Sequence, residues 1–277
     1  MSDSGLFGPD SITWRVNREG VLLLGGGTAL ILQLSHPLVA AGVSEHSNYR
    51  DEPWARLYRT LDATTKIMFG PTALAEDTAK KVRHVHGLIR GETTESAGRF
   101  PAGTKYDART PELLMWVHAT LVRVSLDVYR RYVGPLTIAE QQGYYEEQML
   151  TAEKFGVPRE RQPQTFANFN DYFEGMLAGD DTAVTSALLD VVDATLNLPL
   201  PRVARPLVEA LNLATIGLLP SSLREELHLP WSPTRKRLFD ASRVVLSRSL
   251  PVLPRLFREF PPARSADRRV RKLEAAA

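Results

Sequence analysis

The sequence predicts an all-α fold, built as a single compact multi-helix bundle over residues 1–250. The spacing of apolar residues is helical along most of the chain, and convincing two-residue alternation is missing. The breaks between apolar runs fall at glycine and proline, which end helices. With 277 residues and 43% hydrophobic side chains, the chain is long and apolar enough to bury a sizeable core.

The uncharged stretch Gly20–Ser44 is long enough to suggest a membrane span. It is interrupted by Gly25–Gly27, by Gln33 and by His36 followed by Pro37. We therefore predict two buried helices joined at residues 35–37, with Pro37 in the first turn of the second, where a missing N–H costs nothing. Membrane insertion of this stretch is the alternative.

Helical periodicity then continues to the C-terminal part of the chain. Thr137 and Glu140 have the spacing of an N-terminal capping box, and Gly156–Pro158 should end the helix that follows. Tyr106–Pro111 is expected to be an extended segment that leads into the helix starting at residue 112. The predicted helices cover residues 53–69, 72–90, 112–133, 137–155, 166–177, 182–196, 200–216, 221–227 and 232–246. Residues 251–277 are expected to form a basic C-terminal tail.

The absence of cysteine excludes several kinds of site: disulfides, Cys-ligated zinc, iron–sulfur clusters, thiolate-bound or covalently attached haem, and a Cys nucleophile. Strong nitrogen ligands can come only from six histidines, namely His36, His46, His84, His86, His118 and His228. The sequence contains no HExxH, GxGxxG, GxxxxGK[ST] or GxSxG motif, so zincin, dinucleotide-binding, P-loop and serine hydrolase functions lack support.

Charge is unevenly distributed along the chain. Residues 232–277 hold 12 Lys/Arg and 4 Asp/Glu, whereas residues 1–231 hold 22 and 28. A basic C-terminal segment can contact an anionic membrane surface, although a solvated terminal face is the simpler explanation. No zinc-finger spacing or RNP-like motif accompanies it, so no nucleic-acid partner is expected. The polar start lacks a basic signal region, which favours a cytoplasmic location.

A histidine- and arginine-rich segment, Val82–Arg90, is the densest group of residues that could carry chemistry. On one helix Arg83, His86 and Arg90 share a face, while His84 points elsewhere. Gly87 lies beside that face and lacks a Cβ where a flat group could approach. The arrangement suits an anionic planar cofactor; a surface histidine pair on a basic helix is the alternative.

His118 lies in an uncharged ten-residue stretch in the middle of the predicted helix 112–133. Burial there would keep its imidazole neutral, as an iron ligand must be, although a hydrogen-bonded core histidine would look the same. His36 stands at a predicted helix start, where a capping role and a pocket role are equally compatible with the sequence. A single Glu225-x-x-His228 does not make a di-iron site, which needs two such motifs and two more glutamates.

Six short motifs occur here in a characteristic order: QLSHPLVAAGVSEHS, WARLYRT, VHGLIRG, PELLMWVHATLV, YYEEQ and FGVP. With these motifs the chain resembles the haem-oxygenase-like family that contains the latex-clearing proteins (rubber oxygenases) and the mycophenolic-acid side-chain-cleaving oxygenase. The resemblance implies an all-helical fold around a non-covalent haem b, with His118 as the proximal ligand. The Arg-x-x-Lys-Thr motif of the distal face corresponds to Arg83, His86 and Gly87, so histidine replaces lysine and glycine replaces threonine.

The resemblance thus implies a haem b-dependent oxygenase that uses O2 to oxidise a hydrophobic small molecule. His118 and His86 are the expected iron ligands, and Arg83, Gly87, Arg90 and His36 would line the haem site. His86 and Arg83 are the expected catalytic residues. The alternatives are a non-enzymatic bis-histidine haem protein for electron transfer, sensing or haem binding, and a cofactor-free helical interaction protein.

Overall fold

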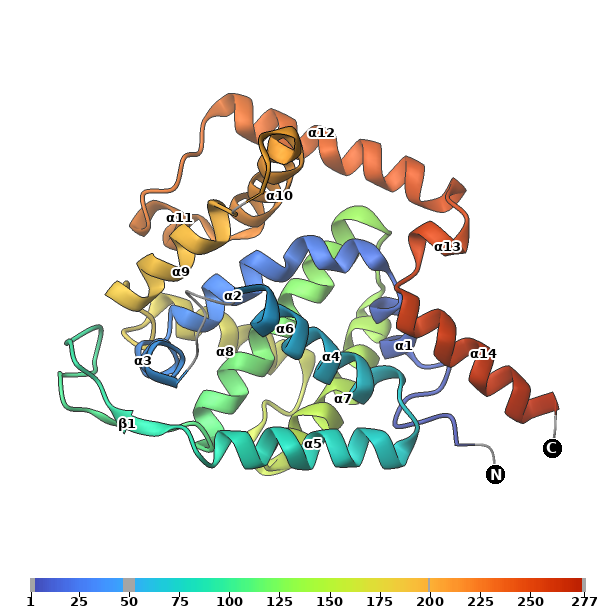
Figure 1. The fold of residues 1–277 in the computed structure, drawn as a ribbon, viewed down its shortest axis with the longest axis horizontal. Coiled ribbons are helices and arrows are strands. Elements are labelled where there is room, and N and C mark those ends of the chain that lie inside the picture. Colours follow the sequence, from blue (N-terminus) through green and yellow to red (C-terminus); the bar gives the residue numbers. More distant parts are fainter. Residues whose placement is uncertain (1–2, 47–52, 199, 276–277) are drawn as a thin grey trace.

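The computed structural model describes residues 3–46, 53–198 and 200–275. Within them the chain is predominantly helical, as predicted (Figure 1). The first half contains α1 (Ile12–Asn17), the 3-10 helix η1 (Gly20–Gly25), α2 (Gly26–Leu34), α3 (Pro37–His46), α4 (Pro53–Phe69), α5 (Thr72–His86), β1 (Arg90–Glu92), β2 (Lys105–Asp107) and α6 (Pro111–Tyr132). The second half contains α7 (Ile138–Phe155), η2 (Arg159–Arg161), α8 (Phe166–Ala178), α9 (Ser186–Leu196), η3 (Arg202–Ala204), α10 (Arg205–Leu218), α11 (Ser221–Glu226), α12 (Pro233–Ser249), η4 (Leu250–Val252), α13 (Arg255–Arg258) and α14 (Pro261–Ala275).

Helix α6 is the centre of the fold, and α2, α7, α8, α10 and α12 all pack against it. Buried residues occur along the whole length of this 22-residue helix and on more than one of its faces; the side chains of Trp116 and Leu126, for example, are fully buried. The Trp116 indole also needs a hydrogen-bond acceptor in the core, and its Nε1 donates to the Leu32 carbonyl on α2 at 3.0 Å. This bond fixes α2 against the part of α6 that carries His118.

The glycine run and the turn after it explain why Gly20–Ser44 is not one long helix. Gly27 approaches α10 so closely that a Cβ there would lie 2.6 Å from Thr215 Oγ1. Helices α2 and α3 are separate, as predicted, with Pro37 at the start of α3. In the described part of the chain no single helix is long and apolar enough to span a membrane; residues 20–34 and 37–46 would qualify only as a pair, and that pair is bent by 105°.

The predicted limits of α7 are confirmed. The Thr137 side chain accepts from the Glu140 N–H while the Glu140 carboxylate accepts from the Thr137 N–H, which is the predicted capping box. The helix ends at Gly156, whose φ of 109° is left-handed and suits glycine.

The predicted helix 72–90 was too long, because α5 ends at His86. The chain turns after Gly87 and enters an antiparallel hairpin in which Gly91 is paired with Tyr106. Gly91 is required there, because a Cβ would lie 2.6 Å from the Tyr106 hydroxyl and 2.7 Å from the Glu45 carboxylate. Two residues of the predicted extended lead-in, Tyr106 and Asp107, thus belong to strand β2.

Much of the segment 251–277 is helical and packs on the body. Ala263, Ala266 and Val270 of α14 are buried in one cluster with Trp14 and Phe69, so this helix covers α1 and α4. A buried ion pair lies nearby. The Arg258 guanidinium donates twice, at 2.8 Å each, to the carboxylate of Glu19, which is 2% exposed.

Candidate functional site

His118 lies on the buried face of α6 and is 6% exposed. Its Nε2 atom is buried and has no hydrogen-bond partner among the described residues. A buried polar atom without a partner costs free energy, and native proteins keep few of them. The unpartnered nitrogen is therefore available to a group that the protein alone does not contain.

The surroundings of His118 keep its imidazole neutral. Burial lowers its pKa to about 4, and the backbone carbonyl of Gln148 on α7, which favours the protonated ring, offsets only part of that shift. Above about pH 5 the ring is consequently neutral. A neutral imidazole nitrogen is the form that binds iron or zinc.

His86 is the last residue of α5 and has similar properties. Its Nδ1 atom is buried and unpartnered among the described residues, and burial lowers its pKa. His84, two residues earlier, is exposed, as the helical spacing predicted. The structure therefore distinguishes the two histidines of this segment and turns only His86 inward.

Three helix segments meet beside these histidines. The Arg83 guanidinium donates to the Lys154 carbonyl at the end of α7, and so joins the last turn of α5 to α7. A Cβ on Gly156 would lie 3.5 Å from Leu114 Cδ1 on α6 and 3.8 Å from Arg83 Cδ. His118 lies one helical turn after Leu114, and His86 lies nearly one turn after Arg83.

The structure thus brings Arg83 to the segment of α6 that leads to His118. It shows no hydrogen bond or ring contact between His86 and His118 among the described residues. Gly87 is the C-cap of α5, and a Cβ there would face the His84 carbonyl at 3.1 Å and Arg109 Cδ at 3.8 Å.

Arg90 lies outside α5 and begins β1, so it does not share a helical face with Arg83 and His86 as predicted. The reason is the turn at Gly87, which ends the helical register before Arg90. Its guanidinium instead donates to the Gly87 carbonyl at 2.7 Å.

His36 lies in a different corner, between α2 and α3. Its Nδ1 accepts from the Leu38 N–H at 3.3 Å, and its ring lies 5.1 Å from that of Phe100. Burial lowers its pKa to about 4; Asp181 opposes that shift and Arg99 adds to it. Of the two roles that the sequence left open for His36, the described contacts show helix capping.

The sequence interpretation missed a polar cluster between α3 and the hairpin. The Tyr106 hydroxyl donates to Glu45, and His46 Nε2 lies 3.2 Å from the Arg90 carbonyl. Burial and the neighbouring Glu45 carboxylate raise the pKa of Tyr106. The one available signal in the sequence is the aromatic residue Tyr106 between charged neighbours, a pattern that by itself indicates only an extended segment.

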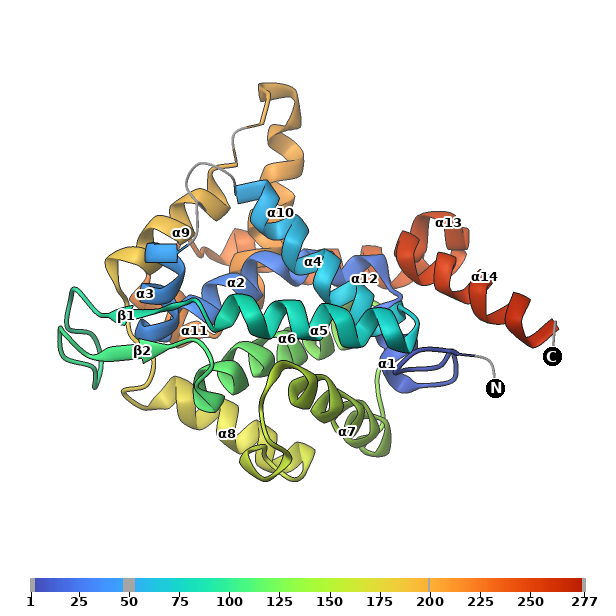
Figure 2. The same ribbon diagram turned by 60° about the horizontal axis from the view of Figure 1, so that its bottom comes forward.

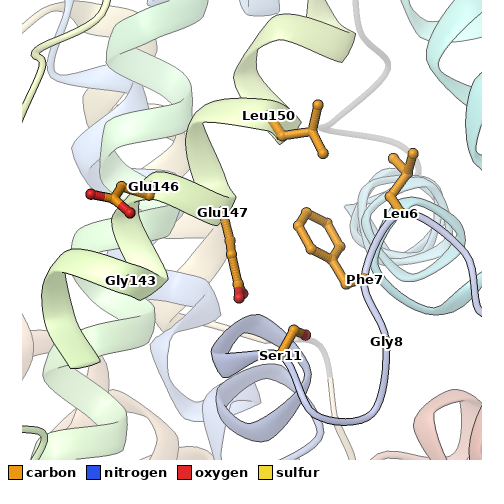
Figure 3. Close-up of a pocket in the computed structure, with 8 residues that line it drawn as sticks. All are labelled: Leu6, Phe7, Gly8, Ser11, Gly143, Glu146, Glu147 and Leu150. Carbon is orange, nitrogen blue, oxygen red and sulfur yellow. The ribbon is translucent and has the colours of Figure 1, made fainter. Parts of the chain in front are cut away.

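A surface hollow between the N-terminal segment and α7 contains no histidine (Figure 3). Its lining consists of Leu6, Phe7, Gly8, Ser11, Gly143, Glu146, Glu147 and Leu150. The Glu147 carboxylate is already bound there, since it accepts from the Thr13 N–H at 2.7 Å and from the Ile12 N–H at 3.3 Å. It serves as a cap for α1, and the hollow has no residue suited to redox chemistry.

A metal held by side chains alone lacks support in the described residues, where no three His, Asp or Glu side chains lie together as a ligand group. Haem requires fewer protein ligands than a metal ion held by side chains alone, because its porphyrin supplies four nitrogens and the protein only one or two axial ligands. The unpartnered Nε2 of His118 and Nδ1 of His86 fit that demand.

Comparison with known proteins decides the family. The family model described as "ER-bound oxygenase mpaB/B'/Rubber oxygenase, catalytic domain" matches residues 14–248. The chain belongs to the mpaB/rubber oxygenase family. The match extends from α1 to the last turn of α12, so it includes His36, Arg83, His86 and His118 and excludes α13 and α14.

Two mycobacterial relatives of this mpaB/rubber oxygenase domain are described only as uncharacterised proteins. They are Mb2261 of Mycobacterium bovis and Rv2237 of Mycobacterium tuberculosis, each 27% identical over 215 residues, which cover 76% of this chain and 82% of the relative. No solved structure matches the chain. Membership supports an oxygenase-like function and leaves the substrate undefined.

Proposed function

We propose that the chain is a haem b-dependent oxygenase that oxidises a hydrophobic small molecule with O2. The observation that carries the proposal is the unpartnered Nε2 of His118, buried in the core of a chain that belongs to an oxygenase family. When bound, haem would supply the redox-active iron at which O2 is reduced.

His118 would hold the iron as its proximal ligand. Its low pKa matters here because a protonated imidazole cannot bind a metal. Helix α6 is well suited to hold this ligand in place, since it is packed on several sides and joined to α2 through Trp116.

His86 would be the second histidine of the site. Its buried Nδ1 would hold or release a proton there, or would bind the iron as a second protein ligand. His86 replaces the lysine in the pattern of the latex-clearing proteins, and an imidazole is a better iron ligand than a lysine side chain that keeps its proton.

Arg83 would provide positive charge beside this site. Its bond to the Lys154 carbonyl holds the guanidinium in position. It would stabilise negative charge that develops on oxygen or pair with a haem propionate.

The spectrum of the purified protein tests the proposal. Protein from cells supplied with haem precursor should show a Soret band, which changes on reduction with dithionite and again on exposure to O2. His118→Ala should lose stoichiometric haem, whereas the control His84→Ala, on the exposed side of α5, should keep it. Colourless wild-type protein, or a full Soret band in His118→Ala, would contradict the proposal.

The non-enzymatic alternative makes a different prediction for the same sample. Two unpartnered imidazoles favour it as well, since both could remain on the iron. A reduced protein that stays six-coordinate and does not respond to O2 would support electron transfer, sensing or haem binding in place of oxygenation. If His86 binds the iron, His86→Ala should convert a low-spin six-coordinate spectrum to a five-coordinate one; an unchanged spectrum would leave His86 only the proton-holding role.

A further inference from the structure

The outer face of α12 and the short helices η4 and α13 that follow it expose an unusual number of large apolar side chains. Leu238 and Val245 on α12 are 56% and 64% exposed, and Val252, Leu256 and Phe257 are 79%, 63% and 74% exposed. Single exposed apolar residues are normal, but groups of them mark contact surfaces. We call the exposed residues from Arg237 to Phe257 the α12–α13 surface.

The geometry of α12 separates this surface from the core. Phe239 is buried, and its ring lies under the Arg131 guanidinium of α6, with 3.5 Å between the ring centroid and Cζ. Leu238 and Val245 are seven residues apart and therefore share one face, directed away from that contact. Helix α12 lies along the edge of the molecule opposite α5 (Figure 1), and α13 and α14 lie at one end of the molecule (Figure 2).

Free positive charge accompanies the apolar side chains. Arg237, Arg243 and Arg248 are exposed and make no ion pair or side-chain hydrogen bond with any described residue. The sequence from 237 to 257 contains a single acid, Asp240, which is already bound by Lys236 at 2.8 Å. The surface is therefore both apolar and cationic.

We propose that the α12–α13 surface docks peripherally on an anionic phospholipid membrane. Exposed Leu and Phe side chains would enter the boundary between headgroups and acyl chains, while unpaired arginines bind lipid phosphates. A nucleic acid would match the arginines but not the apolar side chains. A second copy of the chain would bring the same unpaired arginines face to face, and like charges oppose that arrangement.

Vesicle flotation with the full-length protein tests this directly. Protein at low ionic strength should float with vesicles of phosphatidylcholine containing about a third phosphatidylglycerol, and several-fold less with pure phosphatidylcholine. Salt at about 0.5 M should reduce the bound fraction, because it screens charges at a surface. The assay requires neither haem nor substrate, so its outcome is independent of the proposed oxygenase function.

Two double variants separate the two parts of the surface. Arg237→Glu with Arg248→Glu should weaken binding to anionic vesicles by at least about 25-fold, since each lost cation accounts for about fivefold. Leu256→Ser with Phe257→Ser should weaken binding to both kinds of vesicle. All four side chains are exposed, so the fold should be unaffected.

Matched controls place the same changes elsewhere. Lys80→Glu with Arg202→Glu repeats the charge change, and Ile138→Ser with Val203→Ser repeats the apolar change, all at exposed positions outside the α12–α13 surface. Equal binding of test and control variants would overturn the proposal, as would wild-type protein that stays unbound. A concentration-dependent dimer that Leu256→Ser with Phe257→Ser abolishes would assign the surface to a second copy instead.

Discussion

Two buried histidines of this molecule have similarly lowered pKa values but different surroundings. His36 and His118 are 4% and 6% exposed, and burial lowers the pKa of each to about 4. The His36 ring is engaged, since its Nδ1 accepts from Leu38 and its face packs on Phe100. The Nε2 of His118 is both buried and without a partner among the described residues. Burial alone therefore does not distinguish the two histidines; the buried, unpaired nitrogen of His118 does, and it supports the proposal that His118 binds haem iron.

The sharpest test of this comparison removes each imidazole. His118→Gly should weaken haem binding by more than about 100-fold, since loss of an outer-shell partner alone costs 10- to 100-fold. Added imidazole should restore the Soret band by occupying the vacated position. His36→Asn should bind haem like the wild type. Equal loss in both variants would mean that both histidines serve only the fold.

The two histidines should contribute equally to the pH dependence of the free energy of unfolding. Each has a folded-state pKa of about 4 and an ordinary unfolded value near 6.5, so the unfolded chain takes up protons first as pH falls. The stabilisation is present above pH 6.5 and is lost as pH falls toward 4. The loss is about 3 kcal/mol for each histidine.

Urea denaturation of the haem-free protein between pH 7 and pH 4.5 measures this loss. His36→Asn and His118→Gln should each flatten the pH dependence by a similar amount. A slope that neither variant changes would show that other groups control acid unfolding.

The smallest expected effect concerns capping at His36. His36→Ala removes the acceptor for the Leu38 N–H at the start of α3 and should cost about 1 kcal/mol at pH 7 through the lost cap. His36→Asn keeps an acceptor at the same position and should cost less. Denaturant midpoints of the two variants decide the point; an equal cost for both would show that ring packing on Phe100 dominates.

The sequence was most informative where local signals determine structure. The capping box at Thr137, the proline at position 37 and the glycine at 156 each set a helix limit through their own backbone chemistry, and the structure confirms all three. The uncharged run around His118 likewise predicted its burial. These features require no knowledge of the rest of the chain.

The errors arose where structure depends on distant residues. The strands of the hairpin have three residues each, too few to show two-residue alternation, and α5 was therefore extended to Arg90. The bond from Arg83 to the Lys154 carbonyl joins residues 71 apart in sequence, and no spacing rule anticipates it. The capping contact of His36 depends on how α3 leaves the turn after α2, so the sequence alone leaves both of its roles open.

The ion pair of Glu19 and Arg258 has a consequence for synthesis of the chain. Its partners are 239 residues apart, and the Glu19 carboxylate is almost completely buried. While the chain grows from its N-terminus, only Arg18, whose Nε lies 3.8 Å from the same carboxylate, can offset the charge, and both 2.8 Å hydrogen bonds to Glu19 are missing until Arg258 has been made. The segment around Glu19 should therefore reach its final packing only after the last helices have left the ribosome.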